Sequence, residues 1–205
     1  MYKSLLVFLL FLNSNASSQE FLDIDGVLCP SEGSAKRKND QALNRLKNRF
    51  IFPQKSDFDA QFCWEELSKF EDDRDKFDEK KAAILRGYVL RVRMSEKETC
   101  NCNSENPDFR DTHIVITPSK EKRGVLDQII VEVTPRMRLL MKEKGIDWSQ
   151  AALKKLYGRT IEVQGWLFYD LKHGDQSAKI TQKTKGVTRS TAWEIHPVTN
   201  ISVIR

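Results

Sequence analysis

Two histidines and two glutamates occupy alternate positions in three segments that read as strands. His113 precedes an Ile-Val-Ile run, Glu132 stands between two valines, and Glu194 and His196 flank an isoleucine. Alternation puts these four side chains on one face of their strands, away from the apolar residues. Imidazole and carboxylate groups that converge hold a divalent metal or work as an acid–base pair. An ordinary solvated outer face would show the same alternation, so whether they converge stays open.

Three further residues could extend this cluster. Asp111 lies two positions before His113, and Asp170 and His173 follow the next predicted strand. All three carry groups that bind metals or transfer protons. A one-residue slip in strand register would turn any of these side chains to the other face of the sheet.

A second candidate surface is positively charged. The segment 171–189 has five basic residues against one aspartate, and Arg91 and Arg93 alternate with apolar residues in an earlier strand. A basic loop beside a sheet face can track phosphates, with Trp166 and Phe168 as aromatic rings on which bases stack. The alternative is a solvated lysine loop. The predicted binding residues are Arg91, Arg93, His113, Glu132, Trp166, Lys179, Lys183, Lys185, Arg189, Glu194 and His196.

An Asp-x-Asp-Gly motif lies near the N-terminus, in Phe21–Leu28. Asp23 and Asp25 resemble the nucleophile and the acid/base of haloacid-dehalogenase-type phosphatases. That site needs a strand buried on both faces, whereas few apolar residues lead into this motif. We therefore expect an aspartate–glycine turn here.

The first residues have the organisation of a signal peptide. Lys3 is followed by the apolar run Leu5 to Leu12 and by small residues that allow cleavage after Ala16. We predict export, with a signal peptide at 1–18, a helical and loop extension at 19–80 and a barrel at 81–205. The 205-residue chain carries a net charge of +5, a mild excess that is compatible with an anionic partner.

Four cysteines favour disulfides in an exported protein. Cys29, Cys63, Cys100 and Cys102 allow three pairings, and we expect Cys100 and Cys102 to bridge to Cys29 and Cys63. A thiolate metal site is the alternative, although the spacing fits no zinc motif.

The elements that must position these residues are five strands. They are predicted at 87–94, 113–117, 129–133, 159–169 and 191–203, with a kink at Gly165. Thr134-Pro135 begins a helix that Gly145 ends, and a second helix precedes Gly158. Residues 34–50 form another helix with an apolar stripe of Leu43, Leu46 and Phe50. We predict an all-β core, α+β overall: a five-stranded OB-like barrel with a helical insertion between strands three and four and a helical N-terminal extension.

Residues 81–204 also resemble a group of small exported bacterial proteins, described as hypothetical or as nucleic-acid-binding proteins with an OB-fold. The resemblance implies the same barrel. The blocks that carry it are Lys81-Ala-Ala, Gly87-Tyr-Val, Cys100-Asn-Cys, Asp111-Thr-His113, Val131-Glu-Val-Thr-Pro-Arg136, Gly165-Trp-Leu-Phe-Tyr-Asp170 and Trp193-Glu-Ile-His-Pro-Val-Thr199.

These features predict an exported OB-fold binding protein rather than an enzyme, without a cofactor or a membrane span. Its expected ligand is single-stranded nucleic acid or another anionic polymer. The first alternative is a metal-dependent, nuclease-like hydrolase that uses the histidines and glutamates. The second is a structural module that binds another protein.

Overall fold

A computed structural model describes residues 21–69, 72–181 and 186–204. The predicted signal peptide at 1–18 therefore lies outside the described residues. Among the described residues, no helix is long and apolar enough to cross a membrane.

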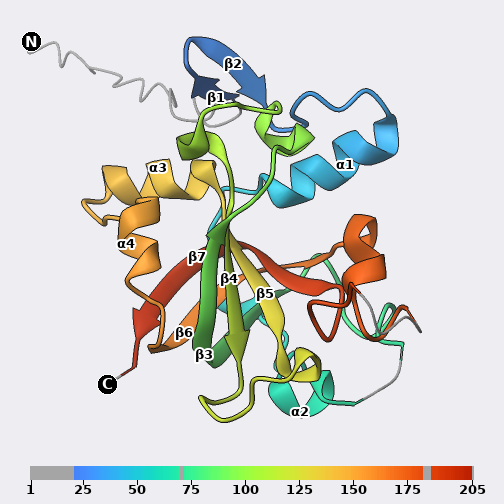
Figure 1. Ribbon diagram of the computed structural model, residues 1–205. Coiled ribbons are helices and arrows are strands. Elements are labelled where there is room, and N and C mark those ends of the chain that lie inside the picture. Colours follow the sequence, from blue (N-terminus) through green and yellow to red (C-terminus); the bar gives the residue numbers. More distant parts are fainter. Residues whose placement is uncertain (1–20, 70–71, 182–185, 205) are drawn as a thin grey trace, which may run out of the picture.

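Five strands close into a barrel (Figure 1). Around the barrel the order is β3-β4-β5-β7-β6, and every pairing is antiparallel except that of β5 with β7. The predicted five-stranded barrel and α+β class are thus confirmed. The strands are β3 (Ala82–Met94), β4 (Thr112–Thr117), β5 (Ile129–Val133), β6 (Thr160–Tyr169) and β7 (Trp193–Val203).

The barrel interior is built from alternate apolar side chains. As predicted, Ile114, Val131 and Ile195 point inward and are fully buried. The alternation over 87–94 predicts one shared face with Tyr88, Leu90, Val92 and Met94, but Val89 fills the core whereas Tyr88 and Leu90 are only half-buried. A bulge between Val89 and Arg91 shifts the register and reverses which positions face inward.

Gly165 is the predicted irregularity in β6, and the pairing with β7 shifts register on both sides of it. A Cβ atom at this position would collide with the Pro197 carbonyl oxygen and the Ile195 side chain. Glycine is therefore required by the close approach of β7.

Two helices connect β5 to β6, as expected: α3 (Pro135–Glu143) and α4 (Gln150–Lys154). Thr134 caps α3, its hydroxyl oxygen accepting a hydrogen bond from Met137 N at 3.2 Å. Ser149 caps α4 in the same way through Ala152 N.

The Asp-Gly motif forms the tight turn of a hairpin, β1 (Phe21–Ile24) and β2 (Val27–Pro30). Asp25 and Gly26 both have positive φ, and Asp23 Oδ1 accepts a hydrogen bond from Gly26 N at 2.7 Å. The expected turn is confirmed.

The rest of the N-terminal extension contains α1 (Lys38–Lys47) and α2 (Trp64–Leu67). Residues 34–37, expected to be helical, precede α1. The helix also buries a different face from the predicted apolar stripe: Asn44, Lys47 and the following Asn48 are buried, whereas Leu43 and Leu46 are half-buried. Short 3-10 helices complete the description: η1 (Lys55–Asp57), η2 (Thr99–Asn101), η3 (Pro107–Phe109), η4 (Val125–Asp127) and η5 (Leu171–Gln176).

One disulfide joins Cys29 in β2 to Cys102 in the β3–β4 connection. The expected second bridge is not formed, because Cys63 and Cys100 are free thiols. Cys100 is buried beside two carboxylates instead of a sulfur partner.

Candidate functional site

A cleft of about 540 Å³ opens beside the barrel, where the β3–β4 connection and the segment after β6 border β4 and β5. Its lining includes Arg93, Glu98, His113, Glu132 and Glu194. Glu132 and Glu194 are almost fully buried, so the cleft leads from solvent to a polar layer on the outside of the barrel wall.

The four residues singled out in the sequence converge in this layer. His113 and Glu132 are register partners on β4 and β5, with Nε2 and Oε1 3.0 Å apart. His196 Nδ1 lies 3.3 Å from Glu132 Oε2 and 3.4 Å from Glu194 Oε2. Strand pairing therefore brings both imidazoles to the two oxygens of one carboxylate.

The N-terminal extension covers this layer, which explains why outward-facing residues are buried. Lys47 of α1 places Nζ 2.6 Å from Glu98 Oε2, and Asn48 Nδ2 donates to the Cys100 carbonyl oxygen at 2.8 Å. Arg49 donates to the carbonyl oxygen of His196 at 3.2 Å. The outer side of the barrel wall is therefore buried as well, and its buried side chains are polar.

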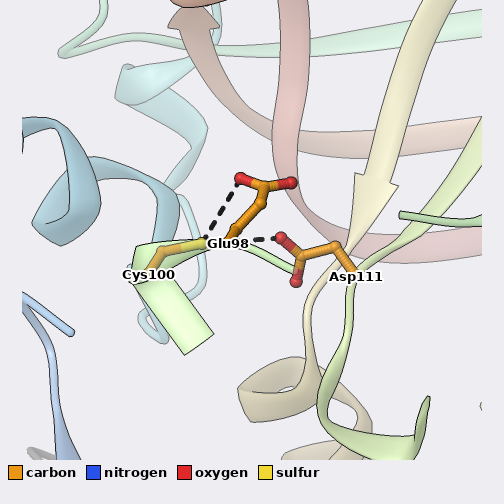
Figure 2. Close-up of side chains that lie close together, drawn as sticks. All are labelled: Glu98, Cys100 and Asp111. Carbon is orange, nitrogen blue, oxygen red and sulfur yellow. Dashed lines mark hydrogen bonds between the residues drawn. The ribbon is translucent and has the colours of Figure 1, made fainter. Parts of the chain in front are cut away.

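Glu98, Cys100 and Asp111, all in the β3–β4 connection, bring their side chains close together (Figure 2). The Cys100 sulfur lies 3.5 Å from Glu98 Oε2 and 3.9 Å from Asp111 Oδ2. Asn101 Nδ2 donates to the other Asp111 oxygen at 3.0 Å. Asp111 was anticipated from the sequence, whereas Glu98 and Cys100 were not assigned to the cluster.

Three overlapping sets of side chains could hold a metal ion. Within each set, the candidate ligand atoms lie within 4.8 Å of one another. Glu132 is shared by the set that contains His113 and the set that contains His196. Glu98 and Asp111 also belong to the set that contains Cys100. The sets are Glu98–His113–Glu132, Asp111–Glu132–His196 and Glu98–Cys100–Asp111.

Electrostatics in the cluster is dominated by burial and by the carboxylates. Burial alone would lower the pKa of His113, but the Glu132 carboxylate outweighs it and raises that pKa from 6.5 to about 9. Burial alone would raise the pKa of Glu132, but His113 and His196 hold it well below its usual value. Burial raises the pKa of Asp111 and of Glu194. Protonated imidazoles, together with Lys47 beside Glu98 and Arg189 beside Glu194, thus balance the carboxylates.

Two of the predicted basic residues are internal ion-pair partners. Arg189 is buried between Glu194 and Asp170, the latter 3.2 Å away, and Lys179 Nζ lies 2.8 Å from Asp73. Both side chains are at most 3% exposed and present no charge to solvent. Lys183 and Lys185 lie outside the described residues.

Arg91 and Arg93 are exposed on β3. Arg91 donates to Gln128 Oε1 at 2.8 Å, and Arg93 lines the cleft. Of the two, only Arg93 is placed where an anionic ligand in the cleft would meet it.

The predicted stacking rings are turned away from solvent. Trp166 is 7% exposed, donates through Nε1 to the Ile51 carbonyl oxygen at 2.8 Å, and lies beneath the Arg49 guanidinium. Phe168 is buried edge-on against His196. Both rings help to attach the N-terminal extension to the barrel.

Comparisons of this chain with protein-family models and with curated proteins found no match. The geometry of the cleft is therefore the basis for a functional proposal.

Proposed function

We propose that the protein is a metal-dependent hydrolase of phosphoesters, with a catalytic cation held by Glu98, His113 and Glu132 in the cleft. The observation that carries this proposal is His113. Its buried Nδ1 has no hydrogen-bond partner, while Nε2 lies 3.0 Å from Glu132 Oε1 and the ring borders an open cleft.

The ligand types favour a divalent transition metal. Imidazole with carboxylates suits Zn²⁺, Mn²⁺ or Fe²⁺. Catalytic metal sites use a few protein ligands and keep a position open for water or substrate. Here the three ligands come from the side of the barrel and from the β3–β4 connection, and the cleft provides the open side.

The exposed Arg93 gives an anionic substrate one cationic contact at the cleft, beside carboxylates such as Glu96 and Asp175 that also line it. A bound metal would polarise a phosphoryl oxygen and supply a hydroxide nucleophile, while the Arg93 guanidinium orients the phosphate. Single-stranded nucleic acid, the ligand predicted from the sequence, is the substrate class that we propose.

The barrel supports this choice of substrate class. We infer an OB-type barrel, because β5 and β7 pair in parallel and helices connect β5 to β6. OB-folds bind oligonucleotides on the face of strands two and three and on the adjoining loops. The cleft uses the corresponding β4 and β5 and the β3–β4 connection. Export, inferred from residues 1–18, is part of the same proposal.

The test measures hydrolysis of bis(p-nitrophenyl) phosphate and of a labelled single-stranded DNA. Chelation should abolish hydrolysis and added Mn²⁺ or Zn²⁺ should restore it. Glu132→Gln should lower the rate at least about 100-fold, since it removes a ligand. Asp23→Asn is the matched control, because this carboxylate lies in the N-terminal turn, and it should leave the rate unchanged.

The binding-only function gives the opposite result. DNA would bind with an affinity that chelation does not change, and neither substrate would be cleaved. That outcome, with no metal in the purified protein, would overturn the proposed hydrolase and leave the predicted binding protein in its place.

A further inference from the structure

We infer that a second ion position lies deeper in the same cluster, formed by Asp111, Glu132 and His196, with Glu132 bridging the two ions. This inference depends on the proposed function, which concerns only the ion in the cleft. It adds that the site is binuclear.

Glu132 is placed as a bridging carboxylate. Its Oε1 faces His113 Nε2 at 3.0 Å, and its Oε2 faces the ring of His196, with Nδ1 at 3.3 Å. Each position then has one imidazole and two carboxylates, one of them shared. The outer carboxylates are Glu98 for the cleft ion and Asp111 for the deeper ion.

Glu194 leaves His196 ready to act as a ligand. His196 Nδ1 and Glu194 Oε2 are hydrogen-bonded at 3.4 Å. When Nδ1 carries the proton, the lone pair is on Nε2, which lies 3.7 Å from Asp111 Oδ2. A carboxylate that fixes the tautomer of a metal-binding histidine is a common arrangement around protein metal sites.

Two buried atoms at this position lack hydrogen-bond partners. They are His196 Nε2 and Glu132 Oε2, in residues that are 0% and 2% exposed. A buried polar atom without a partner costs about 1–3 kcal/mol. A cation between His196 Nε2 and Asp111 would satisfy the histidine nitrogen and give Glu132 Oε2, which otherwise has His196 Nδ1 at 3.3 Å, a second partner.

The spacing also suits coordination. Metal–nitrogen and metal–oxygen bonds of about 2.0–2.2 Å at tetrahedral angles place two ligand atoms about 3.4 Å apart. The 3.7 Å between His196 Nε2 and Asp111 Oδ2 needs only a small contraction. Two ions about 3.5–4 Å apart are the arrangement that stabilises both the attacking and the leaving oxygen of a phosphoester.

The Cys100 thiol connects the outer ligands of the two positions. Figure 2 shows it between Glu98 and Asp111, with which it makes its contacts at 3.5 and 3.9 Å. The carboxylate of each position is therefore held in part by the same sulfur.

The experiment counts Mn²⁺ ions on the full-length purified protein by equilibrium dialysis with elemental analysis, and records the electron paramagnetic resonance spectrum. We expect two ions per chain and an exchange-coupled spectrum. His196→Ala should bind one ion with the spectrum of isolated Mn²⁺. His173→Ala, the histidine outside both ligand sets, should still bind two. Asp111→Asn, which keeps the hydrogen bond from Asn101 possible, serves as a second variant should His196→Ala not fold.

The failures are distinguishable. One ion per chain, unchanged in His196→Ala and lost in His113→Ala, would overturn the second position and leave the proposed hydrolase intact. No bound Mn²⁺ together with no hydrolysis would overturn both.

Discussion

Ile195 and His196 are neighbours on β7, point to opposite sides of the barrel wall and are both fully buried. Ile195 belongs to an apolar core, where burial stabilises the fold by about 25 cal/mol per Å². His196 belongs to a layer of carboxylates and imidazoles, where burial costs free energy unless every group is paired. Burial therefore contributes favourably to the free energy of folding on the apolar inner side of the barrel wall and unfavourably on its polar outer side. This contrast is the reason for proposing that the outer layer binds an ion.

The largest effect on stability should come from leaving charges in the outer layer without a partner. Arg189→Met removes the cation between Asp170 and Glu194 and should lower the free energy of unfolding by about 3–5 kcal/mol. Urea denaturation of the metal-free protein measures this. Arg91→Met, on the exposed surface, is the control, with an expected change below about 0.5 kcal/mol. Equal effects of the two substitutions would contradict the buried ion-pair network.

The apolar side should respond to loss of volume alone. Ile195→Ala should cost about 2–5 kcal/mol while the folded variant still binds Mn²⁺. His196→Ala should also destabilise the metal-free protein by several kcal/mol, because it leaves the buried Glu132 and Glu194 carboxylates without the imidazole that faces them, and it should in addition weaken ion binding. Denaturation with and without Mn²⁺ separates the two. The comparison fails if Mn²⁺ stabilises His196→Ala as much as it stabilises Ile195→Ala.

Ion binding to the outer layer should raise the free energy of unfolding of the protein. At a Mn²⁺ concentration of 100 times Kd, one occupied site raises the free energy of unfolding by about 2.7 kcal/mol. The increase should disappear when His113 and His196 are both replaced by alanine. Thermal denaturation over a Mn²⁺ series measures it, and an increase of equal size in the double variant would place the ion elsewhere.

The Asp170 carboxylate should give the outer layer a sensitivity to acid. Burial alone would raise its pKa, but His173, Lys47 and Arg189 hold that pKa well below the usual value. A carboxyl group with a depressed folded-state pKa stabilises the fold above its unfolded pKa of about 3.9, and this contribution is lost as pH falls further. Asp170→Asn should therefore be about 2 kcal/mol less stable at pH 7, and the difference should shrink towards pH 3. Asp175→Asn, on an exposed carboxylate of η5, is the control and should change the free energy of unfolding at pH 7 by less than about 0.5 kcal/mol.

The smallest effect on stability is expected at the exposed edge of the cleft. Arg91→Ala and Arg93→Ala should change the free energy of unfolding by less than about 0.5 kcal/mol. Each should reduce the slope of log affinity for single-stranded DNA against log salt by about 1 if its guanidinium contacts a phosphate. Arg37→Ala, on the exposed residue before α1, is the control. Affinity that is absent at low ionic strength, or flat as salt rises, would exclude a phosphate contact.

Local patterns in the sequence were sufficient for most of the barrel. The period of two identified the inward positions of β4 and β5, and Thr134-Pro135 identified the start of α3. The bulge in β3 was missed, because nothing in Val89-Leu-Arg91 differs from a regular strand. Which positions face inward after such a bulge depends on the partner strand.

Half of the cluster could also be predicted. His113, Glu132, Glu194 and His196 alternate with core residues, so the barrel brings them together. Glu98, Cys100 and Lys47 come from a connection and from α1, whose position depends on tertiary contacts. The burial of the basic segment could not be predicted from local sequence, because the ion-pair partner of Lys179 is Asp73, 106 positions earlier in the chain.

The Cys29–Cys102 bond links positions 73 apart and so makes a covalent ring that includes α1, Lys47 and Glu98. Because the disulfide joins the two ends of this segment, thermal motion can disturb its contacts but cannot separate its ends. Reducing this disulfide would therefore loosen the N-terminal extension that covers His113 and His196. The β-barrel itself, which contains neither cysteine, would stay folded.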